Sequence, residues 1–314
     1  REMVMNNLLH LKYAVEVEKT GSISKAAQNL YMNQPQLSKA IRELESSLGI
    51  EIFDRTSTGV FPTKKGAEFL IYAKNILIQI DAMQTLSRPE TKKGQILNVS
   101  VPRASYVSNA FTQFLKELDP DVGMNVDYRE THSVRTMKSV SEGSNDIGII
   151  RYQTKFEAYF LTAMQKYGLE HEDIFEFEYL LLMSEQHPLS YKNIIEYKDL
   201  LEYTEIVHGD ISVPSLPVVP PTERPRNYKN RIAIYERASQ LEILNKLPYS
   251  YMWVSPMPKD ILDRYSLIEK KCSVPKNRYK DLFIYREGYV FTEYDKLFMK
   301  NVRQSLESVV KEAI

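Results

Sequence analysis

Three short apolar stripes within the first fifty residues constrain the fold more than any other feature of this chain. They comprise Leu8, Leu11 and Val15, then Ile23, Ala26, Ala27 and Leu30, and finally Leu37, Ile41, Leu44 and Leu48. Each stripe repeats at steps of three and four residues, which is the period of one buried helix face. The small alanines of the second stripe let another helix cross closely. We therefore expect three short helices packed into one small domain.

Capping residues separate these helices. Gly21 ends the first helix, and Ser22 or Ser24 can accept hydrogen bonds from the N–H groups that begin the second. Asn33 is the predicted N-cap of the third helix. Pro35 lies in the first turn of that helix, where a missing N–H costs nothing. The signals predict two helices joined by a tight turn.

The third helix is predicted to stop near Gly49 and to expose short polar, amide and cationic side chains. Such groups suit base edges in the major groove and phosphates. Residues 54–59 are then predicted to form the tip of a basic hairpin between residues 52–53 and 60–61. A polar helix face is often only a solvated surface, but three helices, a turn and a hairpin in register favour DNA binding. The candidate DNA-binding residues are Ser24, Asn33, Gln34, Pro35, Gln36, Ser38, Lys39, Arg42, Arg55, Thr56 and Ser57.

A longer helix follows, with Thr63 as its candidate N-cap and Pro89 beyond its end. Its apolar residues have 4-3-4-3 spacing, which is typical of a two-helix seam, although the stripe could also pack on its own domain. The candidate dimerisation residues are Phe69, Ala73, Ile76, Ile80 and Met83.

The C-terminal part of the chain predicts an α/β domain. Alternating strands at residues 96–101 and 124–128 and a short apolar strand at 147–150 are separated by two helical stripes. The order β-α-β-α-β implies a parallel sheet with right-handed crossovers. No Gly-x-Gly-x-x-Gly follows the first strand, so a dinucleotide site is not indicated. The fold class is α+β overall.

The N-terminal residues resemble LysR-type transcriptional regulators. The resemblance rests on residues 21–27, Leu30, residues 33–38, Ile41, residues 44–45, 48–49 and 53–55, and then Thr63 and Gly66. It implies that Asn33, Gln34, Pro35, Ser38 and Lys39 lie at the DNA. Asn33 stands where the family commonly has Ser or Thr. The resemblance also implies a dimer through the long helix, in a homodimer or tetramer, and hence an operator with dyad symmetry.

The same resemblance implies a C-terminal effector domain with a periplasmic-binding-protein-like fold of two subdomains around a cleft. We expect a winged helix-turn-helix over residues 5–65, a linker helix over 66–92 and the effector domain over 93–314. Its first subdomain comprises residues 93–176 and 280–314, and its second comprises 177–279. Residues 156–173, expected to be helical, and the proline-rich residues 213–225 depart from the common family pattern.

Ligands in such sheets bind beyond the carboxyl ends of the strands, near helix N-termini. The candidate effector-binding residues there are Arg103, Ser105, Thr131, Ser133, Arg151 and His208. Two arginines near helix N-termini suggest an anionic effector, such as a carboxylate or phosphate compound. The alternative, that Arg103 and Arg151 pair with nearby acids at the surface, stays equally open.

Charge and composition narrow the function further. The net charge is zero, but residues 19–65 carry seven basic and four acidic residues, which suits a DNA reader working as an oligomer. A single cysteine, Cys272, excludes an intrachain disulfide, and no apolar run is long enough for a membrane span or a signal peptide. We expect a cytoplasmic protein.

Enzyme signatures are missing from the sequence. It has no Gly-x-Ser-x-Gly elbow, Walker loop or His-Glu-x-x-His, and its five histidines lack metal-ligand spacing. We expect no metal, no cofactor and no enzymatic activity. A small-molecule-binding or enzymatic α/β protein with an accessory helical domain is the alternative to a regulator.

Overall fold

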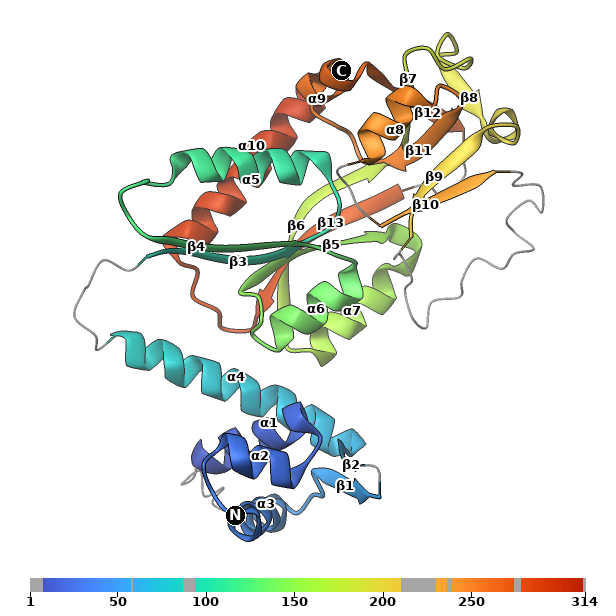
Figure 1. Ribbon diagram of the computed structural model, residues 1–314. Coiled ribbons are helices and arrows are strands. Elements are labelled where there is room, and N and C mark those ends of the chain that lie inside the picture. Colours follow the sequence, from blue (N-terminus) through green and yellow to red (C-terminus); the bar gives the residue numbers. More distant parts are fainter. Residues whose placement is uncertain are drawn as a thin grey trace. The chain divides into compact units, whose positions relative to one another are not determined.

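In the computed structural model, a helical N-terminal unit precedes an α/β C-terminal unit (Figure 1). The structure describes residues 8–57, 59–86, 94–209, 230–235, 239–273 and 278–312. The main boundary between the two units falls between Lys92 and Lys93. Residues 5–7, the end of the linker at 87–93 and the proline-rich residues 213–225 lie outside the described parts.

The N-terminal unit contains the predicted helix-turn-helix and hairpin. Its elements are α1 (Leu8–Thr20), α2 (Ile23–Asn29), α3 (Gln34–Leu48), β1 (Phe53–Thr56), β2 (Gly59–Pro62) and α4 (Lys64–Leu86). Ser22, and not Ser24, caps α2 by accepting from the Lys25 N–H. Asn33 caps α3 by accepting from the Gln36 N–H at 2.9 Å. Gly49 ends α3 in the left-handed region at φ 70°. The predicted capping of α3 is confirmed.

Helix α4 begins against the hairpin. The Thr63 hydroxyl accepts from the Gly66 N–H at 2.8 Å and donates to the Glu51 carbonyl at 2.6 Å. A Cβ on Gly66 would lie 1.9 Å from the Ile52 carbonyl oxygen, so only glycine allows this close approach. The helix starts two residues before the predicted boundary at 66 because Thr63 caps it.

The stripe on α4 is divided between the core of the unit and its surface. Phe69 is half-buried against the helix-turn-helix core, and Ala73 is fully buried within the single chain. Lys74 forms an ion pair of 2.9 Å with Glu18 of α1, which holds this part of α4 on α1. The prediction that Ala73 faces a second subunit is therefore wrong. Met83 is 68% exposed and remains available.

The first sheet of the C-terminal unit has five strands in the order β4-β3-β5-β13-β6. Its strands are β3 (Gln95–Val101), β4 (Met124–Glu130), β5 (Ile147–Gln153), β6 (Leu169–Glu178) and β13 (Arg278–Arg286). Strand β3 pairs in parallel with both β4 and β5, as predicted, whereas β13 runs antiparallel to β5 and β6. This sheet carries the β-α-β-α-β unit.

Helices cover both faces of this sheet (Figure 1). One face carries α5 (Ser105–Glu117) and α10 (Glu293–Glu312), which share a core with β3. The other face carries α6 (Ser133–Ser141), the short helix η1 (Thr154–Phe156) and α7 (Glu157–Lys166). The central strand β5 is buried on both sides, which explains its apolar run at residues 147–150, whereas the edge strands β4 and β6 are largely exposed.

The second sheet has six strands in the order β10-β9-β11-β7-β12-β8. Its strands are β7 (Leu180–Ser184), β8 (Ile194–Glu196), β9 (Thr204–His208), β10 (Arg231–Ile234), β11 (Ser250–Val254) and β12 (Leu267–Ser273). The short helices η2 (Tyr197–Leu200), α8 (Gln240–Lys246) and α9 (Lys259–Tyr265) accompany it. Two separate apolar clusters contain its buried residues. The unit therefore has two subdomains, as expected.

Two predicted boundaries are displaced. Residues 169–173, expected to be helical, form the first half of β6, because they pair with β13 along their whole length. Residues 177–178 and 278–279 belong to β6 and β13 of the first sheet, so the second subdomain is shorter by two residues at each end.

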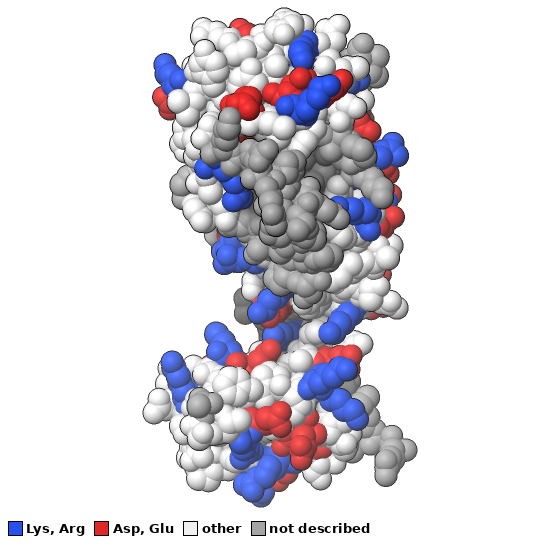
Figure 2. All heavy atoms as spheres, turned by 90° about the vertical axis from the view of Figure 1, so that its right-hand side faces the viewer, with Lys and Arg blue, Asp and Glu red and all other residues white. Residues whose placement is uncertain are grey.

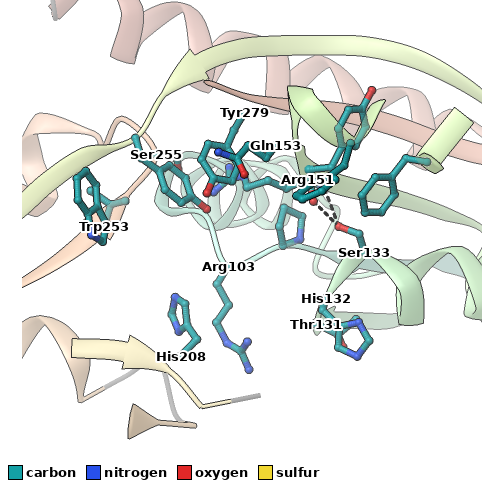
Figure 3. A pocket seen from close by; sticks show the side chains of 16 residues that line it. Arg103, Thr131, His132, Ser133, Arg151, Gln153, His208, Trp253, Ser255 and Tyr279 are labelled. Carbon is teal, nitrogen blue, oxygen red and sulfur yellow. Dashed lines mark hydrogen bonds between the residues drawn. The ribbon is translucent and has the colours of Figure 1, made fainter. Parts of the chain in front are cut away.

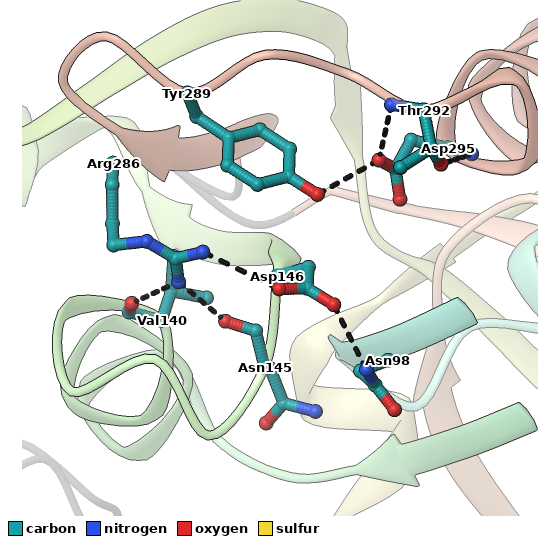
Figure 4. A network of polar contacts seen from close by, with 8 residues as sticks. All are labelled: Asn98, Val140, Asn145, Asp146, Arg286, Tyr289, Thr292 and Asp295. Atoms are coloured by element: carbon teal, nitrogen blue, oxygen red, sulfur yellow. Dashed lines mark hydrogen bonds and ion pairs between the residues drawn. The ribbon is translucent and has the colours of Figure 1, made fainter. Parts of the chain in front are cut away.

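A buried arginine connects the end of β13 to the start of β5 (Figure 4). Arg286 donates from Nη1 to the Val140 and Asn145 carbonyls at 2.9 Å and pairs with Asp146 at 3.3 Å. Asp146 accepts from the Asn98 amide at 2.8 Å, which adds β3 to the network. These contacts fix the strands at the end of the sheet opposite to the predicted ligand site.

Candidate functional site

The exposed face of α3 presents amide and cationic side chains. Gln34, Pro35, Gln36, Lys39 and Arg42 are all exposed, as predicted. Lys39 makes only a solvent-exposed pair with Glu43 at 3.6 Å, which contributes little to stability. Ser24 on α2 is also exposed. These side chains are available to another molecule, and none of them is needed for the core.

Ser38 does not belong to that exposed face. Its side chain is buried, and its hydroxyl accepts a hydrogen bond from Arg55 Nη1 at 3.2 Å. Arg42 Nε donates to the Ser38 carbonyl at 3.3 Å. In this structure Ser38 positions the two arginines, and the prediction of an outward-facing side chain is wrong.

The hairpin is held on α3 by one carboxylate. Glu45 Oε1 accepts from the Ile52 and Phe53 N–H groups at 2.9 and 3.1 Å. Arg55, Thr56 and Ser57 are exposed near the hairpin tip, as predicted. The hairpin thus has a fixed position relative to α3, so both elements can contact one surface.

Tyr31 is a feature of the helix-turn-helix that the sequence did not assign. It lies in the turn between α2 and α3, is 98% exposed and has φ 52°. This left-handed conformation is unfavourable for a residue with a Cβ. An exposed aromatic side chain next to the start of α3 adds to the accessible surface there.

The charges on the surface are mixed. Figure 2 shows Lys and Arg side chains interspersed with Asp and Glu on the visible face, with no continuous basic patch. A protein that coats nucleic acid by charge alone would need a large basic surface. The face in view does not provide such a surface.

The C-terminal unit contains a cavity of about 240 Å³ at the carboxyl ends of β3 and β5 (Figure 3). Both subdomains contribute to its walls. The lining residues are Pro102, Arg103, Thr131, His132, Ser133, Arg151, Tyr152, Gln153, Phe156, Phe160, Tyr179, His208, Trp253, Val254, Ser255 and Tyr279. Five of the six predicted effector-binding residues line it. Ser105, which is buried at the start of α5, is not among the lining residues.

Arg151 is not a free cation in this cavity. Its Nε and Nη2 donate to the two Asp281 carboxylate oxygens at 2.7 and 2.6 Å, and the Asp281 side chain is fully buried. Burial alone would lower the pKa of Arg151, but the Asp281 carboxylate outweighs it and raises the pKa well above its usual value. Of the two alternatives for Arg151, the structure shows the pairing with an acid, although the pair is buried and not at the surface, so the charge of Arg151 is already balanced.

A third group completes this buried cluster. Tyr106 of α5 donates its hydroxyl to Asp281 Oδ2 at 2.5 Å. Burial, and then the neighbouring Asp281 charge, raise the pKa of Tyr106 well above its usual value, so it stays a donor. The Arg151 guanidinium also lies over the Phe177 ring, 4.7 Å from its centre. The pair is thus rigidly held.

The remaining predicted residues have structural partners at the cavity wall. The Ser133 hydroxyl donates to the Arg151 carbonyl at 2.6 Å and accepts from the Arg151 N–H at 3.0 Å. A hydrogen bond of 2.8 Å joins Gln240 Nε2 and His208 Nδ1. Arg103 makes a long hydrogen bond of 3.5 Å to the Tyr235 carbonyl. Thr131 is buried beside them.

Sequence reasoning missed the aromatic wall of the cavity. Tyr179 and Tyr279 stack with their ring centres 4.0 Å apart, and Tyr152 stacks on Phe160 at 4.8 Å. Trp253 lies on β11 of the second subdomain. These rings come from distant segments, so no local spacing connected them. For Asp281 the sequence held one signal of burial: this acidic residue comes directly before the apolar residue Leu282.

Among the residues that the structure describes, no group of three or more His, Cys, Asp or Glu is placed to hold a metal ion. Across the same parts of the chain, no helix combines the length and apolarity required to cross a bilayer.

Residues 8–67 match the family described as "Bacterial regulatory helix-turn-helix protein, lysR family". This match covers the helix-turn-helix, the hairpin and the start of α4. The exposed face of α3 lies within the matched residues, and the match does not depend on the C-terminal unit.

Among curated proteins, the HTH-type transcriptional regulator AlsR of Bacillus subtilis is 28% identical over 193 residues, which is 60% of this chain and 59% of AlsR. This chain spans only 57–59% of the length of three such curated relatives, AlsR included. They are named transcriptional regulators, not enzymes.

Two solved structures share the fold. ArgP from Mycobacterium tuberculosis has a TM-score of 0.63 at 14% identity, covering 96% of this chain and 97% of ArgP. LysG from Corynebacterium glutamicum has a TM-score of 0.64 at 14% identity, covering 95% and 97%. At this identity the similarity supports the architecture alone: a helix-turn-helix followed by a two-subdomain α/β domain.

Proposed function

Because this chain belongs to the LysR-type regulators, we propose that it is a sequence-specific DNA-binding transcription regulator controlled by a small-molecule effector. The observation that carries the proposal is the exposed face of α3, which Asn33 caps and Glu45 ties to the hairpin. In this proposal α3 enters the major groove and reads base edges with Gln34 and Gln36. Lys39, Arg42 and Arg55 contact phosphates.

The protein acts as a dimer or tetramer on an operator with dyad symmetry. The exposed apolar side chains of α4, including Tyr72 and Met83, support pairing through this helix. A dimer places two recognition helices on DNA about one helical turn apart. Its site of action is the cytoplasm, where the DNA is.

The effector occupies the cavity between the two subdomains. LysG, whose fold is shared, is described with the bound effector Arg, which supports control of this chain by a small molecule. A ligand controls DNA binding only if it has different affinities for two arrangements of the oligomer. The relative position of the two sheets is the natural candidate for this difference, because both contribute to the cavity wall.

The test is selection of bound sequences from random duplex DNA by the full chain, followed by gel shifts with competitor DNA. We expect a recovered motif with dyad symmetry. Gln36→Ala should weaken binding to it by about 1–3 kcal/mol and relax specificity at one position. Lys39→Gln should weaken binding to all sequences and reduce the salt dependence by about one phosphate contact.

Lys12→Gln on the exposed surface of α1 is the matched control, because it removes the same charge outside the proposed interface. Failure to retard any DNA at low salt would contradict the proposal. That outcome would favour the alternative of a small-molecule-binding α/β protein with an accessory helical domain.

A further inference from the structure

We propose that the effector is an uncharged planar aromatic compound, and not the anion that two arginines in the cleft suggest. This inference rests on the proposed function, since it names the chemical class of ligand for the same cavity. Three properties of the cavity support it: the nature of its walls, the balance of its charges and its size.

Six of the sixteen residues that line the cavity are Phe, Tyr or Trp, and they form most of its apolar wall. Tyr152, Phe156, Phe160, Tyr179, Trp253 and Tyr279 all line the cavity. They approach from both subdomains, and the Tyr179–Tyr279 pair is nearly parallel, with 15° between the rings. Aromatic rings favour other rings in offset-stacked or edge-on arrangements beyond simple area burial. A flat ring therefore gains more in this cavity than a saturated ring of the same size.

The buried charges of the cavity are already balanced. The Arg151 guanidinium is nine-tenths buried, with 8% of its side chain exposed, and is neutralised by the fully buried Asp281. An anion placed against this pair would leave one uncompensated buried charge, which is costly. Arg103 is only partly buried, so water and salt screen its attraction to an anion.

Arg151 also offers one hydrogen-bond donor to an uncharged ligand. Its Nε and Nη2 are used by Asp281, and no hydrogen bond connects its Nη1 to any residue that the structure describes. A carbonyl or hydroxyl oxygen on the ligand can accept from this atom without adding net charge. The donor thus selects a ring that carries a neutral acceptor.

The volume limits the ligand to a small ring system. A dry protein cavity of about 150 Å³ is known to accept benzene. The cavity here measures about 240 Å³, which leaves room for one ring with a polar substituent or for two fused rings.

Trp253 provides the measurement, because it is the only tryptophan of the chain and it lines the cavity. Four probes separate ring planarity from charge: benzamide, cyclohexanecarboxamide, benzoate and succinate. The readout is saturable quenching of tryptophan fluorescence in the full chain. We expect benzamide to bind, cyclohexanecarboxamide to bind about 3- to 10-fold more weakly, and both anions to bind more weakly than benzamide.

Substitutions assign the binding to the wall. Tyr279→Leu should lower the affinity for benzamide several-fold, and Tyr279→Phe should retain it. Tyr191→Leu is the matched control, because Tyr191 is 78% exposed and does not line the cavity. Thermal unfolding of each variant shows whether the domain is intact.

Each result decides the inference. Equal binding of the planar and saturated amides overturns the aromatic part, and tighter binding of benzoate or succinate overturns the neutral part. Absence of binding by both aromatic probes overturns the inference as a whole. None of these results affects the retardation of DNA by the same preparation, so failure of the ligand class is distinguishable from failure of the proposed function.

Discussion

Replacing Asp281 with asparagine tests the central electrostatic feature of the C-terminal unit. The substitution preserves shape but removes the charge that balances Arg151, whose Nη2 lies 2.6 Å from the carboxylate. It also weakens the acceptor for the Tyr106 hydroxyl. Because the guanidinium stays buried, we expect Asp281→Asn to lower the free energy of unfolding by about 3–5 kcal/mol. In a domain of this size each kcal/mol corresponds to roughly 2–4 °C in the unfolding midpoint.

The assay is thermal unfolding followed by Trp253 fluorescence, which reports on the C-terminal unit. Asp127→Asn is the control, because its pair with Arg129 spans 3.4 Å with both side chains about half exposed. That exposed pair should contribute about 0–1 kcal/mol. The double variant Arg151→Met, Asp281→Asn removes both charges, so its destabilisation should fall short of the sum of the single variants.

The same substitution should also change what the cavity binds. Without the carboxylate, Arg151 carries an unbalanced positive charge, so benzoate should raise the midpoint of Asp281→Asn more than it raises that of the original chain. A loss of stability no larger than that of Asp127→Asn, together with no effect of benzoate, would refute the reasoning. The buried pair would then not govern the charge of the cavity.

Three other substitutions or reagents test separate parts of the structure. Gly66→Ala should destabilise the N-terminal unit by about 1–3 kcal/mol in urea unfolding, because the Cβ of the alanine would collide with the Ile52 carbonyl. The control Ala67→Gly should cost at most about 1 kcal/mol. Equal effects of the two substitutions would contradict the close approach. Burial lowers the pKa of His187 to about 4, so the folded protein resists its protonation and stability should fall as the pH drops from about 6.5 to 4. His187→Asn retains an acceptor for the Leu189 N–H and should flatten that pH dependence in thermal unfolding; an unchanged slope would exclude His187 as its source. Burial also raises the pKa of Cys272 to about 11, so a thiol reagent at neutral pH should react with the native protein roughly a hundredfold more slowly than with the unfolded chain, and equal rates would show an accessible thiolate.

The helix-turn-helix could be predicted from the sequence because its signals are local. Asn33 caps α3 through a hydrogen bond to Gln36, three residues away, and Gly49 ends the same helix. The stripes of α2 and α3 repeat within a few turns, so their buried faces follow from spacing alone. Ser38 was the exception, since its burial depends on Arg55 reaching back from the hairpin.

The parallel part of the first sheet was predictable from the sequence, but the boundaries of the strands were less so. The parallel pairing of β3, β4 and β5 follows from the alternation of strands and helices. The start of β6 at residue 169 could not be predicted in this way. It is a strand because it pairs with β13, which lies more than a hundred residues further along the chain. Pairing partners distant in sequence leave no periodic signal.

The sequence by itself determined most of the exposed face of α3 and which strand ends lie at the cavity, since both follow from helix and strand periodicity. Only the tertiary structure decided the chemistry of the cavity. It placed Asp281 against Arg151, 130 residues apart, and assembled the aromatic wall from both subdomains. The physical reason is that a side chain's charge is visible in the sequence, but whether that charge is balanced depends on neighbours that only folding brings within reach.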